Sequence, residues 1–385
     1  MERRDFVRTM CYGGLATFAL PSVSFAQVGT SSRLVFVLLR GGFDGLAAVV
    51  PYGDPDYRSL RDGFSYNASE LVALDDTFGL APGLSPLRTL WDANELAVVH
   101  AMAIPHRTRS HFDGQAILET GLDRQGSSDG WLNRLLQVMS GKRSGIAIAA
   151  GMPLSLTGSY QVESWSPTQL GAVDDAFLER LAVLYRSDRT LANRFEAALA
   201  QKDLVGEEAM ARGNARRGGI TPLMQAAAKI LRQEQGPNIA AMEFSGWDTH
   251  ANQGLAGGAL DRLLGQLAEG LVAFRTDMGT AWKNTTVVVM TEFGRTARPN
   301  GTRGTDHGTA GAGFVLGTRV GKSHVVADWP GLSTQSLFEK RDLKPTLDTR
   351  AVLKGALAGT FDLTAAQLER VFPGSAAVRA AAVIA

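Results

Sequence analysis

The chain has 385 residues, of which 45% are hydrophobic, and a formal net charge of +1 at pH 7. This length and composition suffice to bury a large core, in one big domain or in two. Because the charge is balanced and no basic block is interleaved with aromatic residues, nucleic-acid binding is not expected.

The first 26 residues have the pattern of an export signal. Arg3 and Arg4 form a twin arginine, a mostly apolar run extends from Met10 to Leu20, and a small-residue cleavage site ends at Ala26. We therefore expect export through the twin-arginine translocase, cleavage after Ala26, and a periplasmic or secreted mature chain. A cytosolic protein with a basic start and an uncleaved anchor are the alternatives.

The mature chain that this signal predicts contains no cysteine, because Cys11 lies within the signal. Disulfides, cysteine metal ligands and a cysteine nucleophile are thereby excluded. No later apolar run approaches the roughly 18 residues that a membrane span needs. We expect no stable membrane span after signal cleavage.

Strand patterns and helical patterns alternate along the mature chain. This alternation predicts an α/β fold with a mostly parallel, doubly wound sheet and helices on both faces. We expect residues 27–385 to form a single domain with an exposed loop near 204–219, where the sequence is polar and charged. The strand patterns are Leu34 to Leu39, Leu96 to His100, Gly145 to Ala150, Ile239 to Phe244, Thr286 to Met290 and Gly313 to Leu316, and the main helical patterns are Ala176 to Ala200, Pro222 to Gln233 and Leu255 to Met278.

Acids and histidines follow the ends of several predicted strands. In α/β proteins, ligands bind in the loops beyond the carboxyl ends of the strands. A mixed set of carboxylates and imidazoles suits zinc, manganese or a similar divalent ion. The alternative is that these residues are helix caps and hydrogen-bonded loop residues. The set consists of Asp248, His250, Glu292, Asp306 and His307, and Asp44 stands beyond a further strand.

A second polar cluster precedes a helical pattern that starts near Phe112. A hydroxyl at a helix N-terminus lies among unpaired N–H groups, where an oxyanion is stabilised. Ser110 has this place and is a candidate nucleophile, with Thr108 as its competitor; an N-cap needs the same geometry. Arg109 and Arg295 are candidates to hold an anionic ester through forked hydrogen bonds, and solvated loop arginines are the alternative.

Five motifs resemble those of the exported family of unknown function numbered 1501, and they span nearly the whole mature chain. That family is placed in the alkaline-phosphatase-like superfamily, which includes phosphatases, sulfatases and phosphomutases. The resemblance implies a mainly parallel sheet with a two-metal site along its carboxyl edge. The motifs are Leu-Arg-Gly-Gly-Phe-Asp-Gly-Leu (Leu39 to Leu46), Arg-Ser-His-Phe-Asp (Arg109 to Asp113), Gly-Trp-Asp-Thr-His (Gly246 to His250), Thr-Glu-Phe-Gly-Arg-Thr (Thr291 to Thr296) and Gly-Thr-Asp-His-Gly (Gly304 to Gly308).

The resemblance also implies roles for single residues. The chain departs from the superfamily in two places, because Asp248 and His250 stand closer together than usual and Glu292-Phe293 replaces an Asp-His pair. One or two ions are therefore expected. By motif, Asp44 resembles the first-strand metal ligand, Ser110 the nucleophile, Asp248 and His250 the ligands of one ion, Glu292 an acidic ligand of the other, and His307 the late histidine ligand.

The function that these observations favour is metal-dependent hydrolysis of a phosphate or sulfate ester, in a small molecule or a polymer, through a covalent Ser110 ester. One alternative is a non-catalytic metal- or ligand-binding protein on the same fold, acting with a partner in envelope or surface-polymer processing. Convergence of the acids around an open position favours the enzyme, and Arg295 filling the metal position favours the binding protein. A redox enzyme with an organic cofactor is a weaker alternative, because Gly41 to Gly45 lacks the dinucleotide spacing.

Overall fold

The computed structural model describes residues 32–139, 143–149, 151–167, 175–186, 188–189, 191–192, 195–196 and 219–385. The predicted signal at residues 1–26 lies outside the described residues. The same holds for the predicted loop near 204–219 except for Gly219. The single-domain extent of residues 27–385 stays a prediction.

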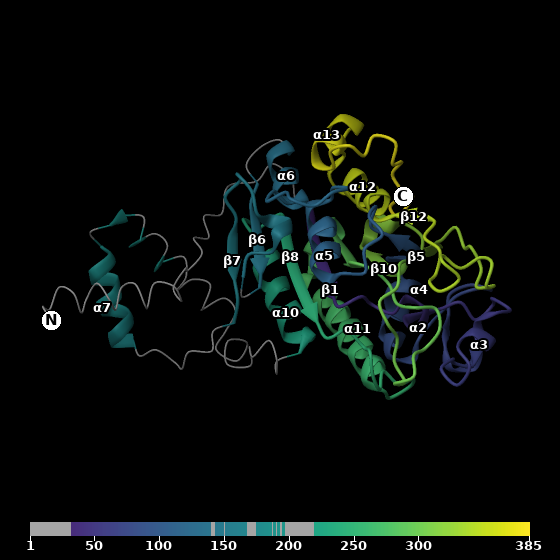
Figure 1. The fold of residues 1–385 in the computed structure, drawn as a ribbon. Coiled ribbons are helices and arrows are strands. Elements are labelled where there is room, and N and C mark those ends of the chain that lie inside the picture. The colour runs from purple at the N-terminus through teal and green to yellow at the C-terminus, as the bar shows by residue number, and fades with distance from the viewer. Residues whose placement is uncertain are drawn as a thin grey trace, which may run out of the picture.

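A nine-stranded sheet forms the centre of the described part of the chain (Figure 1). Its strands are β1 (Arg33–Arg40), β5 (Leu96–Ala103), β6 (Gly145–Ile148), β7 (Glu163–Trp165), β8 (Ile239–Ser245), β9 (Thr285–Thr291), β10 (Gly311–Leu316), β11 (His324–Val326) and β12 (Leu347–Asp348). Their order is β11-β5-β10-β9-β1-β8-β6-β7, with β12 also paired to β5. A small second sheet joins β2 (Val49–Val50), β4 (Gly79–Leu80) and β3 (Val72–Ala73).

Most strands of the large sheet pair in parallel, and β10 is antiparallel to both of its neighbours, β9 and β5. β1 has a parallel partner on each side, β8 and β9. Such a strand needs apolar residues on both faces, and its sequence Leu34 to Leu39 supplies them. The predicted α/β fold with a mostly parallel sheet is therefore confirmed.

Helices cover both faces of the sheet, and alternate residues of β1 pack into two different cores. Val35 and Val37 belong to the core that α10 and α11 close, whereas Leu34 and Phe36 belong to the core that α5, α6 and α12 close. The helices are α2 (Gly45–Ala48), α3 (Tyr57–Leu60), α4 (Arg88–Asp92), α5 (His111–Thr120), α6 (Trp131–Val138), α7 (Asp175–Tyr185), α10 (Ile220–Leu231), α11 (Ala259–Met278), α12 (Thr349–Phe361) and α13 (Ala365–Val371), and the 3-10 turns are η1 (Ala68–Glu70), η2 (Pro82–Leu87), η3 (Leu154–Leu156), η4 (Gly279–Asn284) and η5 (Thr318–Val320).

The strand directions bring five chain segments to one edge of the sheet. β1, β5, β8 and β9 all end at this edge, because β1 is parallel to β8 and β9, and β10 is antiparallel to both β9 and β5. For the same reason β10 begins there, and the segment just before it, with His307, reaches the same edge.

No helix within the described ranges combines the length and apolarity that a bilayer crossing requires.

Candidate metal centre

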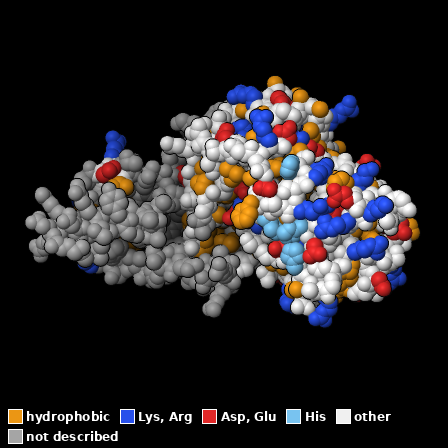
Figure 2. All heavy atoms as spheres, viewed as in Figure 1, with side chains coloured by type: hydrophobic (Ala, Val, Ile, Leu, Met, Phe, Trp, Pro, Cys, Tyr) orange, Lys and Arg blue, Asp and Glu red, His pale blue; other side chains and the backbone are white. Residues whose placement is uncertain are grey.

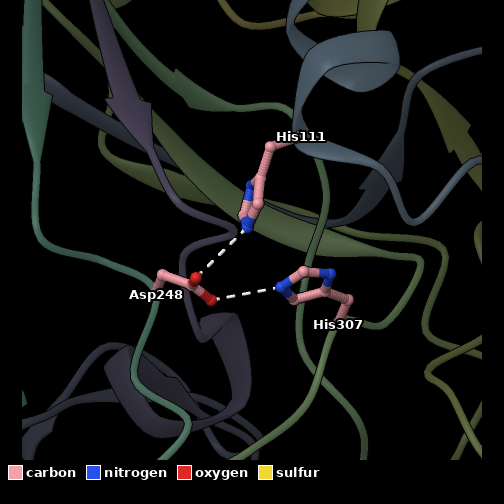
Figure 3. Close-up of side chains that lie close together, drawn as sticks. All are labelled: His111, Asp248 and His307. Atoms are coloured by element: carbon pink, nitrogen blue, oxygen red, sulfur yellow. Dashed lines mark hydrogen bonds and ion pairs between the residues drawn. The ribbon is translucent and has the colours of Figure 1, made fainter.

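Two histidines and an aspartate meet at this edge, each from a different segment (Figure 3). His111 is the first residue of α5, Asp248 follows β8, and His307 precedes β10. One nitrogen or oxygen of each lies within 4.8 Å of those of the other two. The Nε2 atom of His307 lies 3.1 Å from Asp248 Oδ1, and the Nε2 atom of His111 lies 3.4 Å from Asp248 Oδ2.

Protein oxygens fix the Nδ1 side of both histidine rings. His111 Nδ1 donates to Glu292 Oε1 at 2.8 Å, and His307 Nδ1 donates to the Arg109 carbonyl at 2.8 Å. Burial lowers the pKa of His307, so its ring is neutral near pH 7 and its Nε2 carries a lone pair. His111 Nε2 is buried without a hydrogen-bond partner. An anchored Nδ1 with Nε2 turned to the site is how proteins orient histidine metal ligands, and of the two rings only His111 leaves Nε2 without a hydrogen-bond partner.

His250 stands at the margin of this three-residue cluster. Its Nε2 lies 3.0 Å from Asp248 Oδ1 and 3.0 Å from His307 Nε2. Its Nδ1 donates to Asp306 Oδ1 at 2.9 Å, so Asp306 holds a histidine rather than joining the cluster. Both side chains are about half exposed. A third imidazole is thus available at the solvent side.

Glu292 is fully buried, and protein donors occupy both of its oxygens. Oε1 accepts from Gly41 N at 2.9 Å, from His111 Nδ1 and from Gln115 Nε2 at 3.0 Å. Oε2 accepts from the Thr291 hydroxyl at 3.0 Å. Glu292 therefore orients the His111 ring through Nδ1, the nitrogen on the side away from Asp248.

Asp44 lies away from the cluster in a buried ion pair. Its carboxylate accepts from two nitrogens of Arg61 at 2.9 and 3.0 Å and from Gln253 Nε2 at 2.8 Å. Burial alone would raise the pKa of the Asp44 carboxyl, but the Arg61 guanidinium outweighs it and holds that pKa below its usual value. Both side chains are buried, so Asp44 is not among the residues that the structure brings together at the cluster.

Arg295 is buried beside Asp248. Its guanidinium donates to Asp248 Oδ1, to the Gly42 carbonyl at 2.6 Å and to the Thr305 carbonyl at 3.0 Å. Burial would raise the pKa of Asp248, and the Arg295 contact reverses this and lowers it. With these partners Arg295 neutralises the charge of Asp248. Its guanidinium has no exposed pair of N–H groups that could bind an ester.

The second polar cluster is placed at the start of α5. The Ser110 hydroxyl accepts from Asp113 N at 3.5 Å, as an N-cap does, and the Thr108 hydroxyl accepts from Ser110 N at 3.0 Å. The Arg109 side chain is bonded to Asp342 and Glu339. Ser110 is nevertheless the residue directly before His111 in the chain.

His111 is the residue that the sequence did not select. Its signal was present, because it stands in the Arg-Ser-His-Phe-Asp motif after a strand that ends at the same edge. The residues selected from sequence that do join the cluster are Asp248 and His307.

The family described as "Protein of unknown function (DUF1501)" matches residues 91–372 of this chain. The chain belongs to that family. The DUF1501 match confirms the family resemblance, and four of the five motifs lie within the matched residues. No curated protein matches the chain.

Three solved structures are similar to this DUF1501 chain at low identity. The C-terminal periplasmic domain of EcEptC from Escherichia coli, in complex with Zn, is 12% identical over 77% of this chain and 76% of that chain, with a TM-score of 0.37. The PsFucS1 sulfatase from Pseudoalteromonas sp. is 12% identical over 100% and 77%, with a TM-score of 0.37. Ps i-CgsB in complex with k-i-k-neocarrahexaose is 11% identical over 91% and 77%, with a TM-score of 0.40. These similarities are too distant to carry an argument about activity.

Proposed function

We propose that this protein is a metal-dependent hydrolase of phosphate or sulfate esters that holds one divalent ion through His111, Asp248 and His307. The observation that carries the proposal is that two anchored imidazoles turn their Nε2 atoms towards one carboxylate. Ligands of this kind suit zinc, with manganese as the next choice. The residues present fit such an ion, because His111 Nε2 has no other partner.

A single ion is proposed because the other acids at this edge are already engaged. Asp44 is paired with Arg61, and Glu292 accepts from four protein donors. Displacing these donors to admit a second ion would leave buried polar groups without partners, which is costly. The site therefore supports one ion more readily than two.

The surroundings of the cluster favour an anionic substrate. The side chains of His111 and His307 are 25% exposed and that of Asp248 is 43% exposed, so a substrate can reach the ligands. Figure 2 shows Lys and Arg side chains, with Asp and Glu side chains among them, on the same face as the histidines. The Lys and Arg side chains near the ligands would attract an anionic ester. A divalent ion held there would act as a Lewis acid on an ester oxygen.

The chain's own residues would supply the remaining chemistry. Ser110 stays the proposed nucleophile, because its hydroxyl makes only the long 3.5 Å contact to Asp113 N and precedes His111 directly. Thr108 stays its competitor. His250, held by Asp306 through Nδ1, presents Nε2 near the cluster and is placed to hold a proton for the leaving group.

A second candidate function is non-catalytic metal or ligand binding, with a partner in envelope or surface-polymer processing. It is favoured by the buried Arg295, whose charge already offsets Asp248, and by the Arg61 charge on Asp44. For either function, twin-arginine export and a periplasmic or secreted location are proposed on the sequence of residues 1–26.

Metal content and ester hydrolysis, measured together, test the proposal. The wild type is expected to hold about one divalent ion per chain by elemental analysis and to hydrolyse an aryl phosphate or an aryl sulfate, as expected of a mononuclear site. His111→Ala and His307→Ala should each lose the ion and the activity. His324→Ala is the matched control, because both ring nitrogens of His324 bond to carbonyls of Lys322 and Ala382.

The outcomes separate the two candidates. A wild type without bound metal after zinc or manganese loading would contradict both metal-binding functions. A metal-loaded wild type that hydrolyses neither ester, with metal lost in His307→Ala, would favour the non-catalytic protein.

A further inference from the structure

Asp342 is a buried acid outside the three-residue cluster, in the segment between β11 and β12. Its backbone forms an isolated bridge with Thr296, which fixes the segment against the loop that follows β9, and a second with Phe338 of its own segment. No sequence motif selected it. A fully buried carboxylate is costly unless it is paired, so its partners indicate what it is for.

One oxygen of Asp342 receives hydrogen bonds from two different segments. Oδ2 accepts from Arg109 Nε at 3.0 Å and Nη2 at 2.8 Å, and from the Thr309 hydroxyl at 2.8 Å. The other oxygen, Oδ1, has no hydrogen-bond partner and lies 3.3 Å from Arg341 Nη1. A single carboxylate therefore cross-links the segment of Arg109 to that of Thr309.

Both of these segments carry a residue of the cluster. Arg109 stands two residues before His111, and its carbonyl accepts the Nδ1 proton of His307 at 2.8 Å. Thr309 stands two residues after His307. Arg341, next to Asp342, also donates to the His307 carbonyl at 2.9 Å. Any shift of Asp342 would thus be passed to both histidines at once.

We propose that Asp342 is a positioning residue that holds the Arg109 and Thr309 segments together, so that the Nε2 atoms of His111 and His307 are set for a metal ion. This inference rests on the metal centre of the proposed function. Groups that hydrogen-bond to metal ligands typically change metal affinity about 10- to 100-fold, and Asp342 holds Arg109, whose carbonyl is such a group for His307. Asp342 is not itself one of the three residues of the cluster.

Zinc binding to the full chain tests this role. Zinc affinity is measured by competition with a chelator, and the visible spectrum of the cobalt-substituted protein reports the ligand geometry. Asp342→Asn, which removes the charge but keeps the shape, is expected to weaken zinc about 10- to 100-fold and to alter the cobalt bands.

Glu339→Gln is the matched control. Glu339 contacts the same guanidinium at 2.6 Å, but its side chain is 57% exposed. Zinc affinity and the cobalt spectrum should stay as in the wild type. If Asp342→Asn also keeps both, while its unfolding free energy falls, Asp342 is structural only and the proposal is overturned.

If Asp342→Asn does not fold, two smaller substitutions serve for the same test. Thr309→Val and Arg109→Lys each remove part of the cross-link and should each weaken zinc, by less than Asp342→Asn would. Unchanged zinc affinity in both would overturn the proposal. A wild type that binds no zinc would instead remove the proposed function itself, so the two failures are distinguishable.

Discussion

Asp44 and Arg61 compensate each other in a place where neither reaches solvent. Removing one partner leaves the other charge buried and unpaired. Arg61→Met is expected to lower the free energy of unfolding by about 3–5 kcal/mol. Urea denaturation measures the loss. Arg88→Met is the control, because Arg88 pairs with Asp92 in an exposed i,i+4 ion pair, and it should leave the free energy of unfolding almost unchanged.

The Arg61 prediction has a clear contrary outcome. If Arg61→Met and Arg88→Met lose similar free energy, solvent or a neighbouring group screens Asp44. The pair would then be no reason to exclude Asp44 as a ligand.

Ser110 carries two separable roles. Loss of the cap in Ser110→Ala should cost about 1 kcal/mol or less, since the hydroxyl lies 3.5 Å from Asp113 N. Loss of a nucleophile should abolish turnover of an aryl ester without changing metal content. Steady-state rates of the wild type, Ser110→Ala and Thr108→Ala decide the assignment. Equal rates in wild type and Ser110→Ala would remove Ser110 from the chemistry, and loss in Thr108→Ala alone would transfer the role.

The turn after β1 shows how an element sets the approach of a neighbouring segment. Gly41 has φ +126°, and a Cβ placed there would lie 2.6 Å from Asp248 N. Gly41→Ala should therefore displace the Asp248 segment and weaken both folding and zinc binding. Gly63→Ala is the control, because Gly63 also has a positive φ, +66°, but has no atom within 4 Å of the added Cβ.

Thermal unfolding and zinc titration of both glycine variants separate strain from collision. Backbone strain alone lowers stability in both variants by about 1 kcal/mol or more. Only the collision lowers zinc affinity. Equal zinc affinity in Gly41→Ala and wild type would show that the Asp248 segment adjusts freely.

At the scale of elements, the sequence was informative wherever the pattern is local. The apolar run from Leu34 to Leu39 predicts a strand buried on both faces, and the structure pairs it on both sides. Because parallel strands end at one edge, the proximity of Asp248 and His307 follows from topology alone. The role of Arg61 does not follow, since nothing local to its own segment marks Asp44 as a partner. Asp342 could not be predicted for the same reason, whereas His111 stands in the Arg-Ser-His-Phe-Asp motif and could have been selected.

At the scale of the whole molecule, His100 links stability to pH. Its ring is fully buried in β5, Nδ1 accepts from Ala101 N, and Nε2 donates to the Val49 carbonyl at 3.0 Å. Desolvation by burial lowers the pKa of His100 from 6.5 to about 4. The folded state therefore holds the ring neutral, whereas the unfolded chain takes up a proton as the pH falls below 6.5.

The sign follows directly. The stability contribution is complete above pH 6.5 and is lost progressively down to about pH 4, and 2.5 pH units correspond to about 3 kcal/mol. Urea denaturation at pH 7 and at pH 4.5 should show a larger loss for the wild type than for His100→Gln. Equal losses would place the acid sensitivity in other groups.

Each acid at the edge of the sheet has a partner supplied by the chain itself. Arg61 neutralises Asp44, Arg295 neutralises Asp248, and four donors surround the carboxylate of Glu292. Guanidinium groups keep their charge at every physiological pH, so the partners of Asp44 and Asp248 are permanent. In small metal-nucleated domains the chain cannot fold until the ion arrives. In this protein the chain can fold before or after it binds the ion. A chelator should therefore remove the ion while the chain stays folded, and the chain should bind the ion again afterwards.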